Sequence, residues 1–146
     1  IICIYNLKFD VYMLIKNKIK LLVIHCSDTE NNKNLNANDI HEMHLGFGWD
    51  GIGYHKIICR SGEIQNGRPE YWIGAHVKGK NDISLGVCLI GRDKFTNKQF
   101  ISLEKILKKW KLLYPQAKII GHCDTGETNK TCPNFDAVSW SLQKNI

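Results

Sequence analysis

Residues 96–122 of the chain are TNKQFISLEKILKKWKLLYPQAKIIGH, an amphipathic segment followed by a short apolar one. Thr96 and Gln99 have the spacing of a capping box, which satisfies backbone N–H groups at the start of a helix. Apolar residues then recur every three or four positions and form one stripe, and Pro115 ends the pattern. The stretch therefore predicts a helix over 97–114 that packs on a sheet, with a strand directly after it.

Apolar runs elsewhere in the chain predict the other strands of that sheet. Strands are expected at 20–25, 54–59, 85–90 and 117–121, and short helices at 36–45 and 138–142. Alternation of strands with amphipathic helices is typical of α/β proteins, in which helices cover a central sheet. We therefore expect one α/β domain with a central mixed β-sheet flanked by α-helices.

The beginning of the chain has a different character. We interpret residues 1–19 as an N-terminal extension of uncertain status and residues 20–146 as the domain. Polar residues interrupt the apolar ones within 1–12, so neither a membrane span nor a signal peptide is predicted there. This segment is either an artefact of the chosen gene start or an extra strand. We expect synthesis in the cytoplasm and no membrane insertion.

Charge and cysteine usage narrow the possible partners. The 146-residue chain has a formal net charge of +6, which favours an anionic partner such as nucleic acid, a membrane surface or a cell wall. Nucleic acid is the weakest candidate, because no platform of aromatic and basic residues is visible. The basic cluster Lys105, Lys108, Lys109 and Lys111 is interpreted as the solvated face of the long helix. The six cysteines are scattered without CxxC spacing, which favours reduced thiols.

Two histidines and a cysteine form a candidate metal site. His25 and His122 each end a predicted strand, and binding sites of α/β sheets gather at the carboxyl ends of strands. Cys132 lies in a polar loop, two residues after Lys130, so in an extended segment both side chains face one side. The ammonium group is expected to lower the thiol pKa. Two histidines and a cysteine can bind a zinc ion and leave its fourth coordination position open for water. Taken alone, each of the three residues could instead have a purely structural role.

Several other histidines and cysteines could be taken for metal ligands or catalytic residues, but we interpret them as structural. His41 and His44 resemble part of a metalloprotease signature, but they are three residues apart instead of four. His55 is expected to be packed or exposed and not catalytic. Cys26 and Cys123 each follow a candidate ligand, and since successive strand residues face opposite sides, we expect both to be core thiols.

Five motifs occur in the chain in a fixed order. They are Ile24-His25-Cys26-Ser27, Gly51-Ile52-Gly53-Tyr54-His55, Gly74-Ala75-His76, Leu85-Gly86-Val87 and Gly121-His122 with Lys130-Thr131-Cys132-Pro133. In these motifs the chain resembles the zinc-dependent N-acetylmuramoyl-L-alanine amidases of the amidase-2 type, a family that includes phage lysozyme-like amidases and peptidoglycan recognition proteins. The resemblance covers nearly the whole chain from about residue 20 onward.

The resemblance implies that His25, His122 and Cys132 bind one zinc ion per chain and that Tyr54 and Lys130 assist catalysis. Such a zinc holds a water, lowers its pKa and polarises the scissile carbonyl. The implied reaction is hydrolysis of the amide between N-acetylmuramic acid and L-alanine in peptidoglycan, with Tyr54 and Lys130 stabilising the oxyanion. For Tyr54, an aromatic side chain that fills the core is the alternative.

His76 is expected at the cleft in contact with substrate, with a solvated loop histidine as the alternative.

The function that the resemblance implies is that of a phage-type endolysin that acts on the cell wall after release. Two alternatives are a non-catalytic module that binds peptidoglycan fragments, and an amidase that also regulates a protein partner such as a polymerase. Non-catalytic members of the family tend to lose the cysteine ligand, so the presence of Cys132 favours catalysis.

Overall fold

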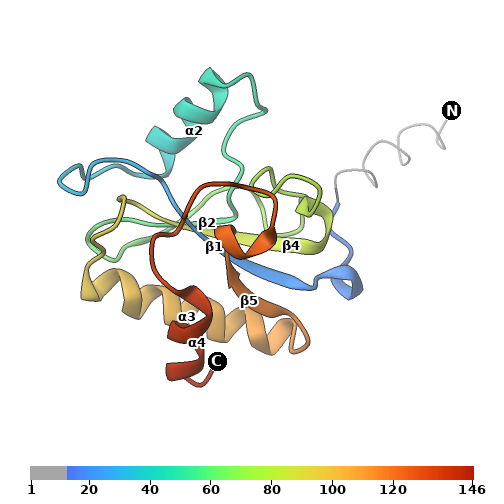
Figure 1. Cartoon of the computed structure of the whole chain (residues 1–146). Helices are drawn as coiled ribbons and strands as arrows, with labels where there is room; N and C mark the ends of the chain where they lie inside the picture. Colours follow the sequence, from blue (N-terminus) through green and yellow to red (C-terminus); the bar gives the residue numbers. More distant parts are fainter. Residues whose placement is uncertain (1–12) are drawn as a thin grey trace, which may run out of the picture.

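The computed structural model describes residues 13–146, which are built around a five-stranded sheet. Along the chain the elements are η1 (Lys16–Lys18), β1 (Leu21–Cys26), α2 (Ala37–Gly46), β2 (Lys56–Ile58), β3 (Ile64–Asn66), η2 (Asn81–Ile83), β4 (Ser84–Leu89), α3 (Asn97–Leu113), β5 (Lys118–Gly121), η3 (His122–Thr125) and α4 (Ala137–Gln143). Figure 1 shows α2 on one side of the sheet and α3 with α4 on the other. The predicted α/β architecture is confirmed.

The strand order β3-β2-β4-β1-β5 places β1 between two parallel neighbours, β4 and β5. β2 is also parallel to β4, whereas β3 is antiparallel to β2, so the sheet is mixed as predicted. In the register of β1, His25 is opposite Cys88 and Ile24 is opposite Gly121. The carboxyl ends of β1 and β5 therefore meet at one edge, where the next residue after β5 is His122.

Helix α3 covers one face of the sheet with its predicted apolar stripe. Its capping box is present, since the Thr96 side chain accepts from the Gln99 N–H and the Gln99 side chain accepts from the Thr96 N–H. Fully buried side chains of the helix include Leu103, Leu107 and Trp110, which pack against apolar residues of β1 and β4. Burial of this apolar stripe stabilises the packing of α3 on the sheet.

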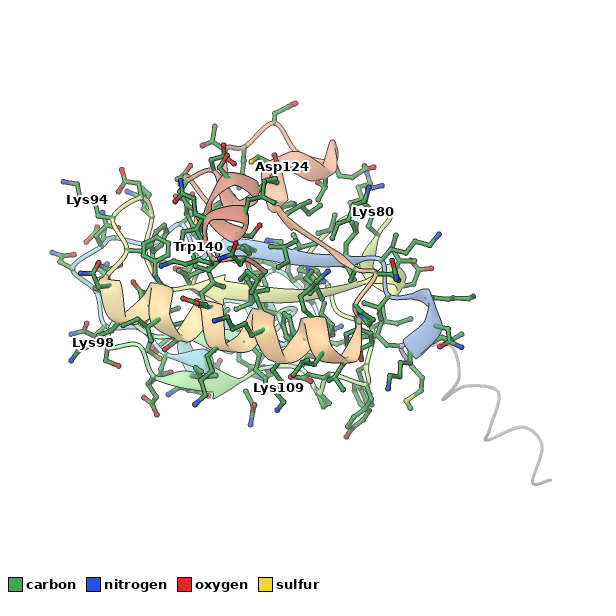
Figure 2. The ribbon with its side chains drawn as sticks, turned by 90° about the horizontal axis from the view of Figure 1, so that it is seen from below. Lys80, Lys94, Lys98, Lys109, Asp124 and Trp140 are labelled. Atoms are coloured by element: carbon green, nitrogen blue, oxygen red, sulfur yellow. The ribbon has the colours of Figure 1, made fainter. Side chains whose placement is uncertain are left out.

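Helix α4 lies beside α3 on the same side of the sheet. Trp140 of α4 points toward α3 (Figure 2), and its ring centroid is 5.8 Å from that of Phe100. Lys98 and Lys109 project from the outer surface of α3 in the same view. Lys105, Lys108 and Lys109 are exposed as predicted, whereas Lys111 is half-buried and donates to the carbonyls of Pro115 and Ala117, at 2.9 and 2.7 Å.

A smaller apolar cluster lies under α2 on the opposite face, where Ile40, Ile57, Cys88 and Ile90 are buried together. The helix expected over 36–45 is present, and Asn36 and Asp39 form a reciprocal capping box at its start. This face carries His25, since alternate residues of β1 point to opposite sides and Ile24 belongs to the core under α3.

The sheet differs from expectation at its β2–β3 edge. The strand expected over 54–59 spans only Lys56–Ile58, so Tyr54 lies in the segment before it. The strand β3 was not predicted, because its residues are few, partly exposed and not clearly apolar. It pairs with β2 in an antiparallel arrangement, and the chain turns between the two strands at Ser61-Gly62.

Residues before the expected domain start at 20 also contact the core, since Ile19 is buried and Leu14 packs against it. The boundary at residue 20 stays a prediction, and the interpretation of residues 1–12 lies outside the described part of the chain. Between residues 13 and 146 no helix is long and apolar enough to cross a membrane. The cysteines of that part are all free thiols.

Candidate metal centre and active site

The three candidate ligands come together at the edge of the sheet. His25 lies near the carboxyl end of β1, His122 opens η3 directly after β5, and Cys132 lies in the loop before α4. One possible ligand atom from each lies within 4.8 Å of the other two. The ring centroids of His25 and His122 are 4.6 Å apart. Two adjacent parallel strands thus bring together histidines that are far apart in the sequence.

The loop that carries Cys132 is bound by backbone N–H groups of β1 and η3. The Cys26 N–H donates to the Sγ of Cys132 at 3.2 Å, and the Cys123 N–H donates to the Cys132 carbonyl at 2.8 Å. The loop approaches the sheet closely at Gly121, where a Cβ would lie 2.8 Å from Cδ of Pro133. Glycine at this position allows the thiol to reach the histidines.

The two histidines are in the protonation state that a metal requires. Burial, together with the neighbouring His76 and His122, lowers the pKa of His25 well below its usual value. Burial and the charge of Lys130 lower the pKa of His122. Both rings are therefore neutral near pH 7, and each has a nitrogen lone pair to donate.

The prediction that Lys130 lowers the pKa of the Cys132 thiol is wrong for the protein without a metal. The pKa of this thiol is raised, first by the hydrogen bond it shares with the Cys26 thiol and then by burial. The two Sγ atoms lie 3.8 Å apart. A metal ion bound at this thiol would have to displace its proton.

This donor set fits zinc. Two neutral imidazoles and a thiolate are nitrogen and sulfur ligands that zinc accepts, and three protein ligands leave one tetrahedral position open. Within the described residues 13–146, His25, His122 and Cys132 are the group of metal-binding side chains found close enough to share one ion. The roles assigned to them remain predictions about binding, supported by this geometry.

Tyr54 and Lys130 line the same cavity as the ligands, a space of about 370 Å³. The Tyr54 ring centroid is 5.0 Å from that of His25, so this side chain faces the site as well as packing on the core under α2. Burial raises the pKa of Tyr54 well above its usual value, so its hydroxyl stays protonated and can donate. Lys130 is exposed to solvent.

His76 also lines the cavity but is not a solvated loop residue, since it is 8% exposed. Its Nδ1 lies 2.8 Å from Nε2 of His25, and its Nε2 lies 3.2 Å from Oγ of Ser84. Both ring nitrogens are thus engaged within the protein. Substrate contact through His76 stays a prediction.

The histidines on α2 have a structural role that the sequence did not reveal. Nδ1 of His41 accepts from the Ile52 N–H at 3.0 Å, and Nδ1 of His44 accepts from the Gly53 N–H at 2.9 Å. Both bonds hold the segment that leads into Tyr54. These histidines position a site residue, which agrees with rejecting them as a metalloprotease signature.

The expected burial of the neighbouring cysteines is only half right. Cys26 is buried, but its thiol contacts Cys132, because the loop carrying Cys132 passes the end of β1. Cys123 is exposed. It lies in η3 and not in a strand, so the alternation of strand faces does not apply to it. His55 is packed inside the protein, the first of the two alternatives considered for it.

One wall of the cavity was not predicted. It consists of Met43, Phe47 and Trp49, which line the space although they are 37%, 63% and 44% exposed. The aromatic residues in the glycine-rich segment after α2 were the feature of the sequence that could have indicated this wall. Large exposed apolar side chains beside a polar site offer a surface for a ligand.

Comparison with known proteins identifies the family. The model of the N-acetylmuramoyl-L-alanine amidase family matches residues 15–135. The chain belongs to this family. The endolysin of Enterobacteria phage K11 is 38% identical over 125 residues, 80% of this chain and 82% of that protein. The endolysin of Escherichia phage T7 is 37% identical over 127 residues, 82% of this chain and 83% of that protein.

The fold of this amidase is that of solved family members. The N-acetylmuramoyl-L-alanine amidase LysC from Clostridium intestinale superposes with a TM-score of 0.79 at 29% identity, over 91% of this chain and 90% of that one. Drosophila PGRP-LB superposes with a TM-score of 0.70 at 27% identity, over 84% and 79%. The predicted resemblance to amidases and peptidoglycan recognition proteins is confirmed.

Proposed function

We propose that the amidase is a zinc-dependent endolysin that hydrolyses the amide between N-acetylmuramic acid and L-alanine in peptidoglycan. The observation that carries this proposal is the meeting of His25, His122 and Cys132 within 4.8 Å, beside Tyr54 and Lys130 in one cavity. The endolysins among the relatives support the phage-type assignment. Retention of the cysteine ligand favours catalysis over a module that only binds peptidoglycan fragments.

The ligands would be one ring nitrogen each from His25 and His122 and the Sγ of Cys132. Zinc bound there supplies a Lewis acid that activates water and polarises the scissile carbonyl. The backbone hydrogen bond from Cys26 to the Cys132 Sγ favours the thiolate, and so partly offsets the Cys26 thiol and the burial that raise the pKa of Cys132. Since the histidines are neutral, they donate without first losing a proton.

Tyr54 and Lys130 are proposed to stabilise the negative charge that develops on the carbonyl oxygen. The Tyr54 hydroxyl remains protonated and can donate a hydrogen bond, and the Lys130 ammonium adds positive charge in the same cavity. Donors already in place before the reaction lower the barrier without reorganising. Removing either group is therefore expected to slow turnover without removing the metal.

The apolar wall of Met43, Phe47 and Trp49 is proposed to contact the substrate outside the reacting amide. The net charge of +6 favours association with an anionic cell wall. We propose that the enzyme is made in the cytoplasm and acts on the wall after release, as its endolysin relatives suggest.

Metal analysis tests this proposal. Protein purified without a metal-binding tag should contain about one zinc per chain. Chelation should abolish the release of stem peptides from purified peptidoglycan, and added zinc should restore it. Full activity in zinc-free protein would contradict the proposed mechanism.

A further inference from the structure

Behind His25, a line of hydrogen bonds connects the proposed metal ligand to the start of β4. Nε2 of His25 lies 2.8 Å from Nδ1 of His76, whose Nε2 lies 3.2 Å from Oγ of Ser84. The Ser84 hydroxyl donates to the Lys80 carbonyl at 2.7 Å. The three side chains are buried, with exposed fractions of 1%, 8% and 0% for His25, His76 and Ser84.

The positions of the protons along this line follow from its last member. A carbonyl oxygen only accepts, so the single hydroxyl proton of Ser84 lies in its bond to Lys80. Ser84 Oγ then accepts from His76, which places the ring proton of His76 on Nε2. In a neutral ring the other nitrogen is an acceptor, so Nδ1 of His76 accepts from Nε2 of His25. The proton of His25 is on Nε2, and its Nδ1 keeps a free lone pair.

We propose that Ser84 and His76 are positioning residues that hold His25 in the Nε2–H tautomer and so present its Nδ1 to the zinc. Metal-binding histidines are commonly oriented by a hydrogen bond at the other ring nitrogen. Here the acceptor is a second histidine, His76. The tautomer of His76 is set in turn by Ser84, whose hydroxyl proton is donated to the Lys80 carbonyl. The reverse proton order would place a proton on Nδ1 of His25 and block the lone pair. The inference rests on the metal site proposed above.

The structure around His76 keeps its ring in this place. The N–H groups of His76 and Val77 both donate to Oδ1 of Asn81, at 2.8 and 2.9 Å. The ring lies against the backbone of Gly86, where a Cβ would be 2.6 Å from Nδ1 of His76. The His55 ring packs edge-on against it, with centroids 5.7 Å apart. A ring held on several sides can fix the tautomer of its neighbour.

Nuclear magnetic resonance of the metal-free full chain tests the proton order directly. The ¹⁵N shifts of a histidine and its couplings to the ring carbon-bound protons distinguish Nδ1–H, Nε2–H and doubly protonated rings. At neutral pH we expect His25 and His76 both to be Nε2–H. An Nδ1–H tautomer of His25 in the wild-type protein would overturn the proposal, and this measurement needs no substitution and no zinc.

Zinc affinity of three variants tests the consequence. Ser84→Ala removes the acceptor for His76, so we expect a mixture of tautomers at His25 and zinc binding weakened by about tenfold to a hundredfold. Ser84→Thr keeps the hydroxyl and should retain the tautomer and most of the affinity. Ser141→Ala is the matched control, because Ser141 is also buried and its hydroxyl donates to a backbone carbonyl, that of Val138, away from the site.

The outcomes separate this inference from the metal site itself. Equal zinc affinity in Ser84→Ala and Ser141→Ala would overturn the positioning role, as would equal weakening in Ser84→Ala and Ser84→Thr. A wild-type chain that binds no zinc would overturn the metal site, whatever the tautomer of His25.

Discussion

The backbone N–H of Cys26 donates a 3.2 Å hydrogen bond to the Sγ of Cys132, across 106 positions of sequence. Cys26 is the residue after His25, so the same strand end holds one proposed ligand and orients another. A backbone donor has little freedom to move, and a hydrogen bond to sulfur favours the thiolate form. The site is therefore largely arranged before any metal binds.

Replacing the thiol should remove the metal. In Cys132→Ser we expect zinc content to fall from about one per chain to a small fraction, and activity on peptidoglycan to fall with it, because a serine hydroxyl is a poor zinc ligand at neutral pH. Elemental analysis and the release of stem peptides measure the two effects. The control is Cys123→Ser, which changes an exposed thiol near the site and should keep both properties. Full zinc content in Cys132→Ser would exclude this residue as a ligand.

Replacing the ammonium group should slow the reaction but leave the metal. In Lys130→Ala we expect normal zinc content and a kcat lower by about a hundredfold to a thousandfold, the usual cost of losing an oxyanion donor. Lys118→Ala removes another exposed lysine, on β5, and should have wild-type kinetics. If Lys130→Ala and Lys118→Ala were equally active, Lys130 would have no role in catalysis.

The Tyr54 hydroxyl can be tested apart from its ring. Tyr54→Phe keeps the aromatic packing on the core under α2, so we expect unchanged zinc content and thermal stability. The kcat should fall by about a hundredfold because the donor is lost. Tyr71→Phe changes a tyrosine that is 59% exposed and serves as the control. Wild-type turnover in Tyr54→Phe would limit this residue to packing.

Buried histidines predict that acid destabilises the metal-free protein. Burial lowers the pKa of His55 from 6.5 to about 4. Between these two pH values the unfolded chain binds more protons, so the free energy of unfolding falls as the pH falls from about 6.5 to about 4. For His55 the difference between the two pKa values corresponds to about 3 kcal/mol at the low end of that range. The lowered pKa values of His25 and His76 act in the same direction.

Urea unfolding at pH 7 and pH 4, in the presence of a chelator, measures this effect. The variant His55→Gln lacks the titrating ring and should lose less stability between the two pH values, although it is less stable than the wild type at pH 7. An equal loss in both proteins would show that His55 does not contribute to the acid sensitivity.

Much of the fold follows from local sequence signals. The capping boxes at Asn36 and Thr96 and the apolar stripe of α3 fix where these helices begin and which face is buried. The positions of His25 and His122 at the carboxyl ends of strands were also predictable, because a polar residue after an apolar run marks the place where a buried strand ends. Their proximity depended on β1 and β5 being neighbours, which the family resemblance implied and local patterns did not.

The remaining features depend on contacts between distant segments. His41 and His44 have the composition of a metal motif, and only the fold shows that they accept N–H groups from Ile52 and Gly53. The raised pKa of Cys132 comes from Cys26, a contact that no local pattern reveals. The short strand β3 has no strong propensity of its own and is held by pairing with β2.

The products released from purified peptidoglycan test the central claim most directly. Incubation with the zinc-loaded enzyme should release stem peptides with a free L-alanine amino terminus and should generate no new reducing sugar ends. The zinc-free protein should release neither. Reducing ends without free L-alanine would show that the enzyme cleaves the glycan strand, and would contradict amide hydrolysis at the site formed by His25, His122 and Cys132.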